Sequence, residues 1–335
     1  MENCEQEFHA QFREVDSLAR KLVCDNLNPR DHHLRHMILF ALHRLAPSDY
    51  PFLFQYAFCR AKKDAATIRK LVAAVHLLQT STIITDDVFD AGTLRFGYPS
   101  LHRKYNSSYA IITAELIQSI AYRIFAAELE HDRFRHACLV MKLMNEMLRN
   151  LYLGQYLDLY YSGRTSLAVS EYYRIIALGA GDFMRNLARC GALLAEKPVP
   201  EVRALAAYGY NYGMALFISD DIVDIISHPR ETGKNFAADL RNARLKLPLL
   251  LTLRLSSGKD RKFLKNFLTR GEPSGSELRH AVQIIQNSGA IAQCTSIARR
   301  YLTRSLQALS RTHSQVSRSH LSWLSTSLLA AQRLE

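Results

Sequence analysis

Two acidic clusters of the same pattern are the residues best suited to chemistry. The first is Asp86-Asp87-Val88-Phe89-Asp90 and the second is Asp220-Asp221-Ile222-Val223-Asp224. Both follow apolar stretches with helical spacing, and positions i, i+1 and i+4 of a helix lie within roughly a third of its circumference. Each cluster therefore presents three carboxylates on one face. Such oxygen ligands suit Mg²⁺, which completes its coordination with substrate phosphates, so the pair predicts a magnesium–diphosphate site.

Long helices are expected to position these clusters. Leu-, Ala- and Ile-rich segments with 3.6-residue spacing dominate the chain, and its 9 Pro and 14 Gly are too few for a loop-rich β protein. No linker separates the clusters, so we expect one all-α domain over residues 1–335. Helices are predicted at 5–25, 30–45, 65–90, 107–127, 133–163, 168–196 and 200–227, with shorter ones at 240–335. Residues 95–100 are predicted to form a turn and residues 228–233 a loop, because both contain Pro and Gly.

Composition narrows the partners and the compartment. The net charge is +12, but the basic residues are dispersed, so no nucleic-acid partner is expected and the positive field would instead attract a diphosphate. The sequence contains no run of 18 or more apolar residues, so no membrane-spanning helix is expected. The acidic N-terminus has no apolar stretch typical of a signal peptide. The six Cys are scattered singly, which favours free thiols in a reducing cytoplasm.

Further motifs surround the two clusters. Arg95 and Gly97-Tyr98-Pro99-Ser100 follow the first cluster, and Gly233-Lys234, Asp239-Leu240, Arg244 and Leu247-Pro248 follow the second. The segment Gly154-Gln155-Tyr156-Leu157-Asp158 lies between them. Together these residues resemble the trans-isoprenyl diphosphate synthases, the family of farnesyl and geranylgeranyl diphosphate synthases.

The resemblance implies an all-α, barrel-like bundle with a central cavity, usually as a homodimer. It implies three Mg²⁺ ions that hold the diphosphate of an allylic substrate, so that diphosphate departs and leaves an allyl cation. Direct metal ligands would be Asp86, Asp90 and Asp220; ligands or their partners would be Asp87, Asp221 and Asp224. Contacts to the substrate diphosphate would come from Arg95, Lys234 and Arg244, with Gln155 also in the substrate site.

Departures from the family concern the site of the acceptor, isopentenyl diphosphate. The family's G-G-K-x-x-R segment corresponds to residues 30–35, where Arg35 remains but His32 replaces the Lys. Gln79 meets the family's need for a His or Gln. The second Arg of the R-R-G motif is Phe96, which cannot bind a phosphate. Protonated His32, His33 and His36 could compensate.

Other substitutions bear on the allylic side and on chain length. Gly179-Ala180 replaces a Lys-Thr pair, and Phe217 replaces a Gln. Phe96 and Phe217 predict a drier, aromatic cavity able to stabilise a cation. The small Ser81 and Thr82 stand where the family's bulky residues stop chain growth, which predicts room for a C20 chain or longer.

Three hypotheses remain open. The first is an enzyme that ionises a C15–C20 prenyl diphosphate and then cyclises it or transfers it to an acceptor other than isopentenyl diphosphate. The second is an ordinary chain-elongating synthase that makes geranylgeranyl diphosphate or a longer product. The third is a regulatory subunit of a heteromeric synthase, although both acidic clusters are intact.

Overall fold

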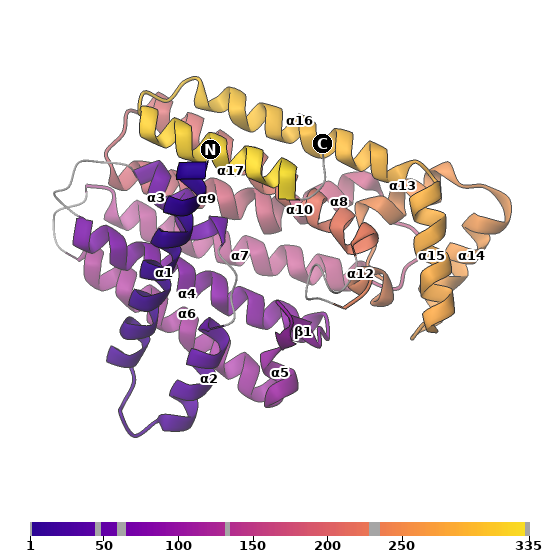
Figure 1. Cartoon of the computed structure of the whole chain (residues 1–335), viewed down its shortest axis with the longest axis horizontal. Helices are drawn as coiled ribbons and strands as arrows, with labels where there is room; N and C mark the ends of the chain where they lie inside the picture. Colours follow the sequence, from indigo (N-terminus) through magenta and orange to yellow (C-terminus); the bar gives the residue numbers. More distant parts are fainter. Residues whose placement is uncertain (1, 44–47, 59–64, 131–134, 228–234, 332–335) are drawn as a thin grey trace.

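The chain folds as a bundle of helices, as predicted. Figure 1 presents its computed structural model, which describes residues 2–43, 48–58, 65–130, 135–227 and 235–331. The helices up to residue 161 are α1 (Glu2–Asp25), α2 (His32–Leu42), α3 (Asp49–Phe58), α4 (Ala65–Phe89), α5 (Leu101–Lys104), α6 (Ser107–Leu129) and α7 (Ala137–Tyr161). The later ones are α8 (Val169–Ile176), α9 (Asp182–Leu194), α10 (Val199–Ile226), α12 (Ala238–Arg241), α13 (Leu247–Leu255), α14 (Gly258–Thr269), α15 (Gly275–Asn287), α16 (Ala290–Leu309) and α17 (Gln315–Ala331).

Three local features differ from the expected elements. The predicted turn at 95–100 contains a small antiparallel hairpin, β1 (Leu94–Arg95) and β2 (Tyr98–Pro99). The single helix expected at 168–196 is divided by a π-helical turn, η2 (Ala177–Gly181). Helix α3 was not predicted; Pro51 stands in its first turn, where proline is tolerated because no N–H bond is lost.

The π-helical turn lies where two backbones approach closely. A Cβ atom added at Gly154 of α7 would stand 3.0 Å from the carbonyl oxygen of Ile175 and 3.1 Å from the backbone nitrogen of Gly179. A larger residue would push these backbone atoms apart by a few tenths of an ångström. The close packing holds α7 against the η2 turn, and both contribute to the cavity described below.

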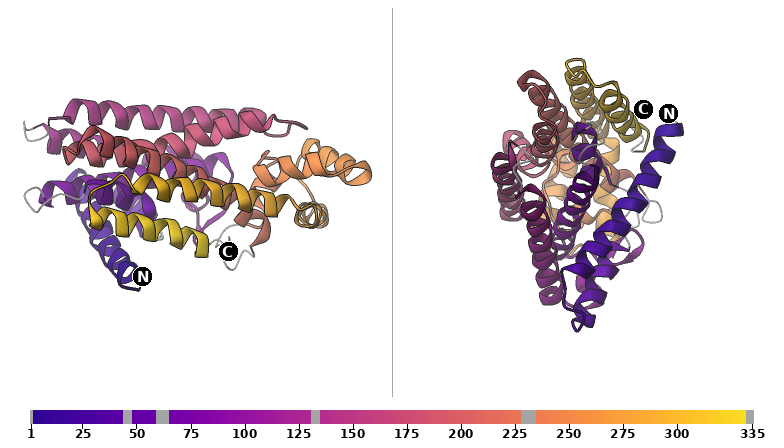
Figure 2. Two further views of the ribbon diagram at one scale, coloured as in Figure 1. Left: turned by 90° about the horizontal axis from the view of Figure 1, so that it is seen from above. Right: turned by 90° about the vertical axis from the view of Figure 1, so that its left-hand side faces the viewer.

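The core consists of two hydrophobic clusters that share two helices. Helix α10 contributes Leu205 to the larger cluster and Ile218 to the smaller one, and α16 likewise contributes Leu302 and Ala298. Both helices run along the body of the bundle, while α14 and α15 lie at one end (Figures 1 and 2). This continuity favours the predicted single domain, which stays a prediction.

One described helix is long and apolar enough to cross a membrane, although no uninterrupted apolar run marks it in the sequence. It is α6, and 44% of its most apolar 18-residue window is buried inside the bundle. Core helices commonly pass this test, so a single such helix is weak support for a membrane span.

Candidate active site

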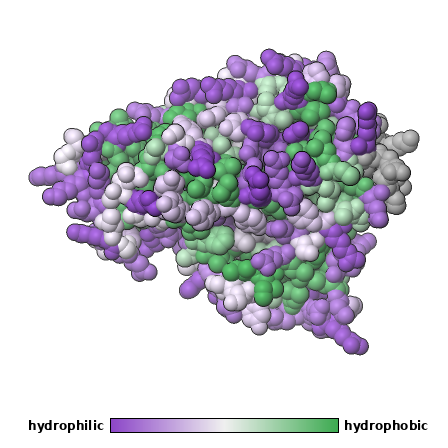
Figure 3. Space-filling view, turned by 180° about the vertical axis from the view of Figure 1, so that it is seen from behind, coloured by the Kyte–Doolittle hydropathy of each residue, from purple (hydrophilic) through white to green (hydrophobic). Residues whose placement is uncertain are grey.

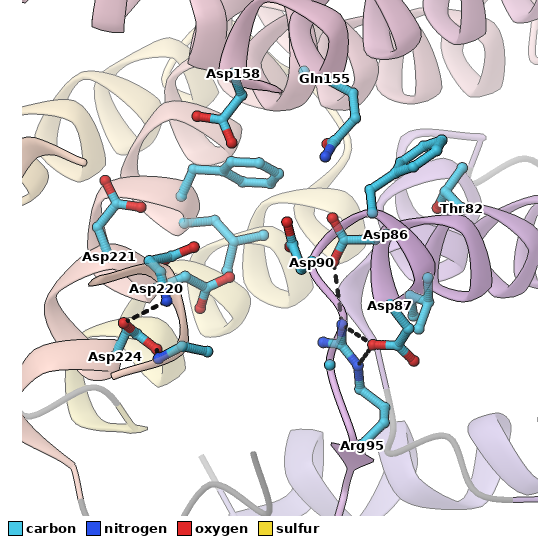
Figure 4. Close-up of a pocket in the computed structure, with 18 of the residues that line it drawn as sticks. Thr82, Asp86, Asp87, Asp90, Arg95, Gln155, Asp158, Asp220, Asp221 and Asp224 are labelled. Atoms are coloured by element: carbon cyan, nitrogen blue, oxygen red, sulfur yellow. Dashed lines mark hydrogen bonds and ion pairs between the residues drawn. The ribbon is translucent and has the colours of Figure 1, made fainter. Parts of the chain in front are cut away.

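The ends of α4 and α10 bring both acidic clusters to one cavity of about 890 Å³. Its lining includes all six cluster carboxylates, and Figure 4 shows the clusters on opposite sides with Gln155 and Asp158 nearby. Helix α4 ends where Ala91 adopts a left-handed φ of +49°, and α10 ends at an extended Ser227. The spacing that looked chemical in the sequence therefore gives two facing rows of oxygen atoms.

Arg95 of β1 holds the first cluster in place. Its guanidinium donates to Asp87 Oδ1 at 2.5 Å through Nη2 and at 2.8 Å through Nε, and Nη2 also lies 3.1 Å from Asp86 Oδ2. The hairpin that carries Arg95 turns at Phe96 and Gly97, whose φ angles are +52° and +80°. A left-handed conformation costs a bulky residue about 1 kcal/mol or more, yet Phe96 keeps it and lines the cavity.

The second cluster is held by backbone groups and a tyrosine. Asp221 accepts a 2.7 Å hydrogen bond from the Tyr172 hydroxyl and a 3.3 Å bond from the Leu247 N–H. Asp224 accepts bonds from the N–H groups of Ala238 (2.9 Å) and Asp239 (3.2 Å). These bonds fix the orientation of two of the three carboxylates before any ligand binds.

Arg244 and Lys246 connect the halves of the site. Arg244 is only 2% exposed, and its Nη2 lies 2.6 Å from Asp90 Oδ1 while its Nη1 lies 3.4 Å from Asp158 Oδ2. Lys246 Nζ lies 3.1 Å from the same Asp158 oxygen. The segment after the second cluster is therefore tied to the end of the first one.

The carboxylates lie in a strongly acidic environment. Burial raises the pKa of Asp90 to about 7, and the nearby charges of Asp86 and Asp239 raise it further. The positive charges of Arg244 and Lys246 lower this pKa in part. Burial also raises the pKa of Asp221 to about 7, although Lys246 and the Tyr172 hydroxyl oppose it. When all the carboxylates of the two clusters are ionised, their mutual repulsion has to be offset by positive charge from bound ligands.

The donor set fits Mg²⁺ shared with a ligand. Among the described residues, no three His, Cys, Asp or Glu side chains stand close enough to hold a metal ion alone. Mg²⁺ commonly takes one or two carboxylates and fills its remaining positions with water and substrate phosphates. Asp86, Asp90 and Asp220 offer such oxygens on both sides of the cavity.

The structure brings most predicted substrate residues to this cavity, but not all. Its lining includes Arg95, Phe96, Gln79, Thr82, Gln155, Gly179 and Phe217. Ser81 does not line it, and Arg244 lines a small adjoining pocket. Arg35 also lies outside the lining and donates to the Cys24 carbonyl at 3.1 Å, and none of the three nearby histidines lines the cavity. Lys234 lies outside the described residues.

Several lining residues were missed in the sequence. They are Ser48, Asp49, Tyr50, His76, Asp158 and Lys246. Helical spacing could have indicated His76, which precedes Gln79 by three positions on α4. No sequence pattern marks Ser48, Asp49 or Tyr50, because the helix that they begin was not expected.

Known proteins resemble this chain over most of its length. The sequence profile described as polyprenyl synthetase matches residues 18–285. The chain belongs to the polyprenyl synthetase family. It is therefore an enzyme, a prenyltransferase of the prenyl diphosphate synthase kind, as the motifs predicted.

Individual relatives cover most of the chain. The geranylfarnesyl diphosphate synthase of Aeropyrum pernix is 29% identical over 245 residues, which are 72% of this chain and 75% of the relative. The geranylgeranyl diphosphate synthase of Sulfolobus acidocaldarius is 25% identical over 72% of this chain and 73% of its own length. A polyprenyl synthase of Caulobacter crescentus, solved with calcium and isoprenyl diphosphate, has the same fold: its TM-score is 0.88 at 23% identity, with 100% of this chain and 98% of that chain covered.

Proposed function

We propose that this member of the family catalyses Mg²⁺-dependent transfer of a prenyl group from an allylic prenyl diphosphate to an acceptor, with release of diphosphate. The observation that carries the proposal is the convergence of Asp86, Asp90 and Asp220 on one cavity. Divalent ions between them would neutralise the departing diphosphate and stabilise its leaving. Calcium and isoprenyl diphosphate in the Caulobacter crescentus synthase support a divalent-metal site, and we keep the number of three Mg²⁺ ions as part of the proposal.

We propose distinct roles for the six carboxylates. Asp86, Asp90 and Asp220 would coordinate Mg²⁺. Asp221 and Asp224, which accept hydrogen bonds from Tyr172 and from the start of α12, would coordinate Mg²⁺ or support the residues that do. Asp87 would support the site through Arg95, whose remaining donor capacity would serve the diphosphate together with Lys234.

Chain elongation with isopentenyl diphosphate is the acceptor chemistry that the relatives favour. Both curated relatives described above are named for prenyl diphosphate products, so the first hypothesis, cyclisation or transfer to another acceptor, has less support than the second, an ordinary synthase. Thr82 lines the cavity and is small, which supports a product of C20 or longer.

A second candidate is transfer to an acceptor without a diphosphate, or cyclisation. The specific observation in its favour is Phe96, which occupies the lining where the family's acceptor site requires an arginine. The regulatory-subunit hypothesis has less support, because both acidic clusters reach the cavity.

We further propose a cytoplasmic homodimer. On the side of the bundle formed by α6 and α7, the exposed large apolar side chains include Ile112 (57%), Tyr156 (59%) and Tyr160 (50%). Figure 3 shows this side from behind, with apolar areas between polar ones. An exposed apolar face on long, neighbouring helices is typical of a protein–protein interface.

The experiment combines the purified chain and Mg²⁺ with C10, C15 and C20 allylic diphosphates, each with and without isopentenyl diphosphate. Released diphosphate is measured, and products are identified by mass spectrometry. We expect diphosphate release to require Mg²⁺ and to fall at least 100-fold in Asp220→Asn. Chain elongation predicts longer diphosphates only when isopentenyl diphosphate is present. Absence of diphosphate release from all three substrates would refute the proposed function.

A further inference from the structure

The start of α3 and the adjoining face of α4 form a part of the cavity that the acidic clusters do not use. Ser48, Asp49 and Tyr50 line it from the α3 side, and His76 and Gln79 line it from α4. We call these five residues the acceptor wall. The wall lies near the reacting centre, because its residues line the same cavity as Asp86 and Asp220.

The acceptor wall has no lysine or arginine. In the described part of the cavity lining, the only such residues are Arg95 and Lys246. Arg95 is paired with the first acidic cluster, and Lys246 is paired with Asp158. A diphosphate binds where several cationic donors converge. The described lining therefore offers cations beside the acidic clusters and none on the acceptor wall.

A carboxylate stands in the wall instead. Asp49 accepts a short hydrogen bond from the buried hydroxyl of Tyr212. Like charges repel strongly in a partly buried site, so each phosphate charge near Asp49 would weaken binding. An ionised Asp49 thus disfavours a second diphosphate in this position.

The wall also contains a buried polar atom, Gln79 Oε1, that has no hydrogen-bond partner among the described residues. The Gln79 residue is 7% exposed. His76 is fully buried, and neither ring nitrogen forms a hydrogen bond; the Asp16 carboxylate is 3.6 Å from Nε2. A buried polar group without a partner destabilises the folded protein, because it has lost its hydrogen bonds to water. A hydrogen-bond donor in the cavity would remove this destabilisation at Gln79.

We propose that the acceptor wall binds the hydroxyl group of an uncharged acceptor in place of a second diphosphate. The hydroxyl would donate to Gln79 or Asp49, and Tyr50 and Phe96 would cover it with aromatic surface. The acceptor is either water or the hydroxyl of an organic alcohol or phenol, which share this chemistry. This inference rests on the proposed function, because it needs an allylic diphosphate to be activated at the acidic clusters.

The reaction balances without a further reagent. The allylic carbon–oxygen bond breaks, and diphosphate leaves with the electron pair. A lone pair of the acceptor hydroxyl forms the new carbon–oxygen bond, and the hydroxyl proton passes to the Asp49 carboxylate and then to solvent. Burial raises the pKa of Asp49 to about 6; the hydrogen bond from Tyr212 lowers this pKa and the charge of Asp220 raises it. The Asp49 carboxylate is therefore ionised at pH 7.5. The product is a prenyl alcohol or ether.

The first test measures the acceptor directly with the full chain and Mg²⁺. Farnesyl and geranylgeranyl diphosphates are supplied in ¹⁸O-water, with phenol or with isopentenyl diphosphate. We expect diphosphate to be released without isopentenyl diphosphate. The product should be an ¹⁸O-labelled prenyl alcohol if water is the acceptor, or a prenyl phenyl ether in the phenol arm if the acceptor is an organic hydroxyl. Elongated diphosphates as the main product, or diphosphate release only with isopentenyl diphosphate, would overturn the inference and leave the proposed function intact. No release under any condition would overturn both.

A binding measurement tests the wall without catalysis. Isothermal titration of isopentenyl diphosphate into the protein, with Mg²⁺ and a non-ionisable thiolo analogue of the allylic substrate, should give a dissociation constant above 1 mM. A micromolar constant would contradict the inference. Phe96→Arg with Tyr50→Arg should strengthen this binding at least tenfold, because both changes add a cation to the cavity.

Two wall variants separate acceptor binding from general damage. Asp49→Asn and Gln79→Leu should each lower alcohol or ether formation at least tenfold, while the affinity for the thiolo analogue stays within twofold. The matched control is Asp260→Asn, an exposed aspartate in the first turn of α14 that should leave both quantities unchanged. An equal loss of analogue affinity in the wall variants would indicate a purely structural role and overturn the assignment.

Discussion

Arg244 provides the sharpest test of how the two halves of the site are held together. Its side chain is 2% exposed; one nitrogen donates to Asp90 Oδ1 at 2.6 Å and to the Phe89 carbonyl at 3.3 Å, and another lies 3.4 Å from Asp158. Arg244→Gln removes the cation and leaves the carboxylate of Asp90 buried without its ion pair. Breaking a buried pair in this way costs about 3–5 kcal/mol of unfolding free energy.

The assay is urea unfolding of wild type and variant in the absence of divalent ions, followed by circular dichroism. With a slope of about 3 kcal/mol/M for a chain of this size, the expected loss moves the midpoint down by roughly 1 M or more. Mg²⁺ with inorganic diphosphate should narrow the difference, because the ions supply positive charge near Asp90. The control is Arg241→Gln, an exposed arginine on α12 that should change stability by about 0.5 kcal/mol or less. Equal midpoints for Arg244→Gln and wild type would refute the reasoning.

Three further predictions concern product length, assembly and pH. Thr82→Phe should shift the main product to a shorter chain, or lower the rate with C20 substrate at least tenfold over C10, because Thr82 lines the cavity; product analysis by mass spectrometry checks it. Tyr156→Lys should dissociate the proposed dimer, as measured by light scattering, since that side chain is 59% exposed on α7. Asp49 has a pKa raised from 3.8 to about 6, so the folded state holds its proton more tightly and wild type loses stability as pH rises from about 4 to 6. Asp49→Asn should remove up to about 3 kcal/mol of that loss, seen as a flatter midpoint–pH curve, and an unchanged curve would contradict it.

Local sequence patterns predicted the elements that carry the acidic clusters. The apolar spacing of α4 and α10 placed Asp86 and Asp220 on long helices, and both helices end within a few residues of the expected positions. Arg95 was also found, because the family resemblance includes the short motif that follows the first cluster; its bonds to Asp86 and Asp87 were not predicted. Such features depend on neighbours a few residues apart, which a sequence displays directly.

The acceptor side could not be predicted in this way. The resemblance pointed to Arg35, but that side chain donates to the Cys24 carbonyl and does not line the cavity. The cavity is lined there by Asp49 and Tyr50, from a helix that no periodic pattern indicated, and the buried partner of Asp49 is Tyr212, 163 positions later. Contacts over such separations depend on how the helices pack.

The sequence by itself determined the fold class, the two metal-type carboxylate clusters and the family, because helical periodicity and closely spaced motifs are local properties. Only the tertiary structure decided which carboxylates are already held by Tyr172, Arg95 and Arg244, and which side chains form the acceptor wall. The physical reason is that burial, ion pairing and the loss of hydrogen-bond partners arise when segments distant in the chain pack together and exclude water.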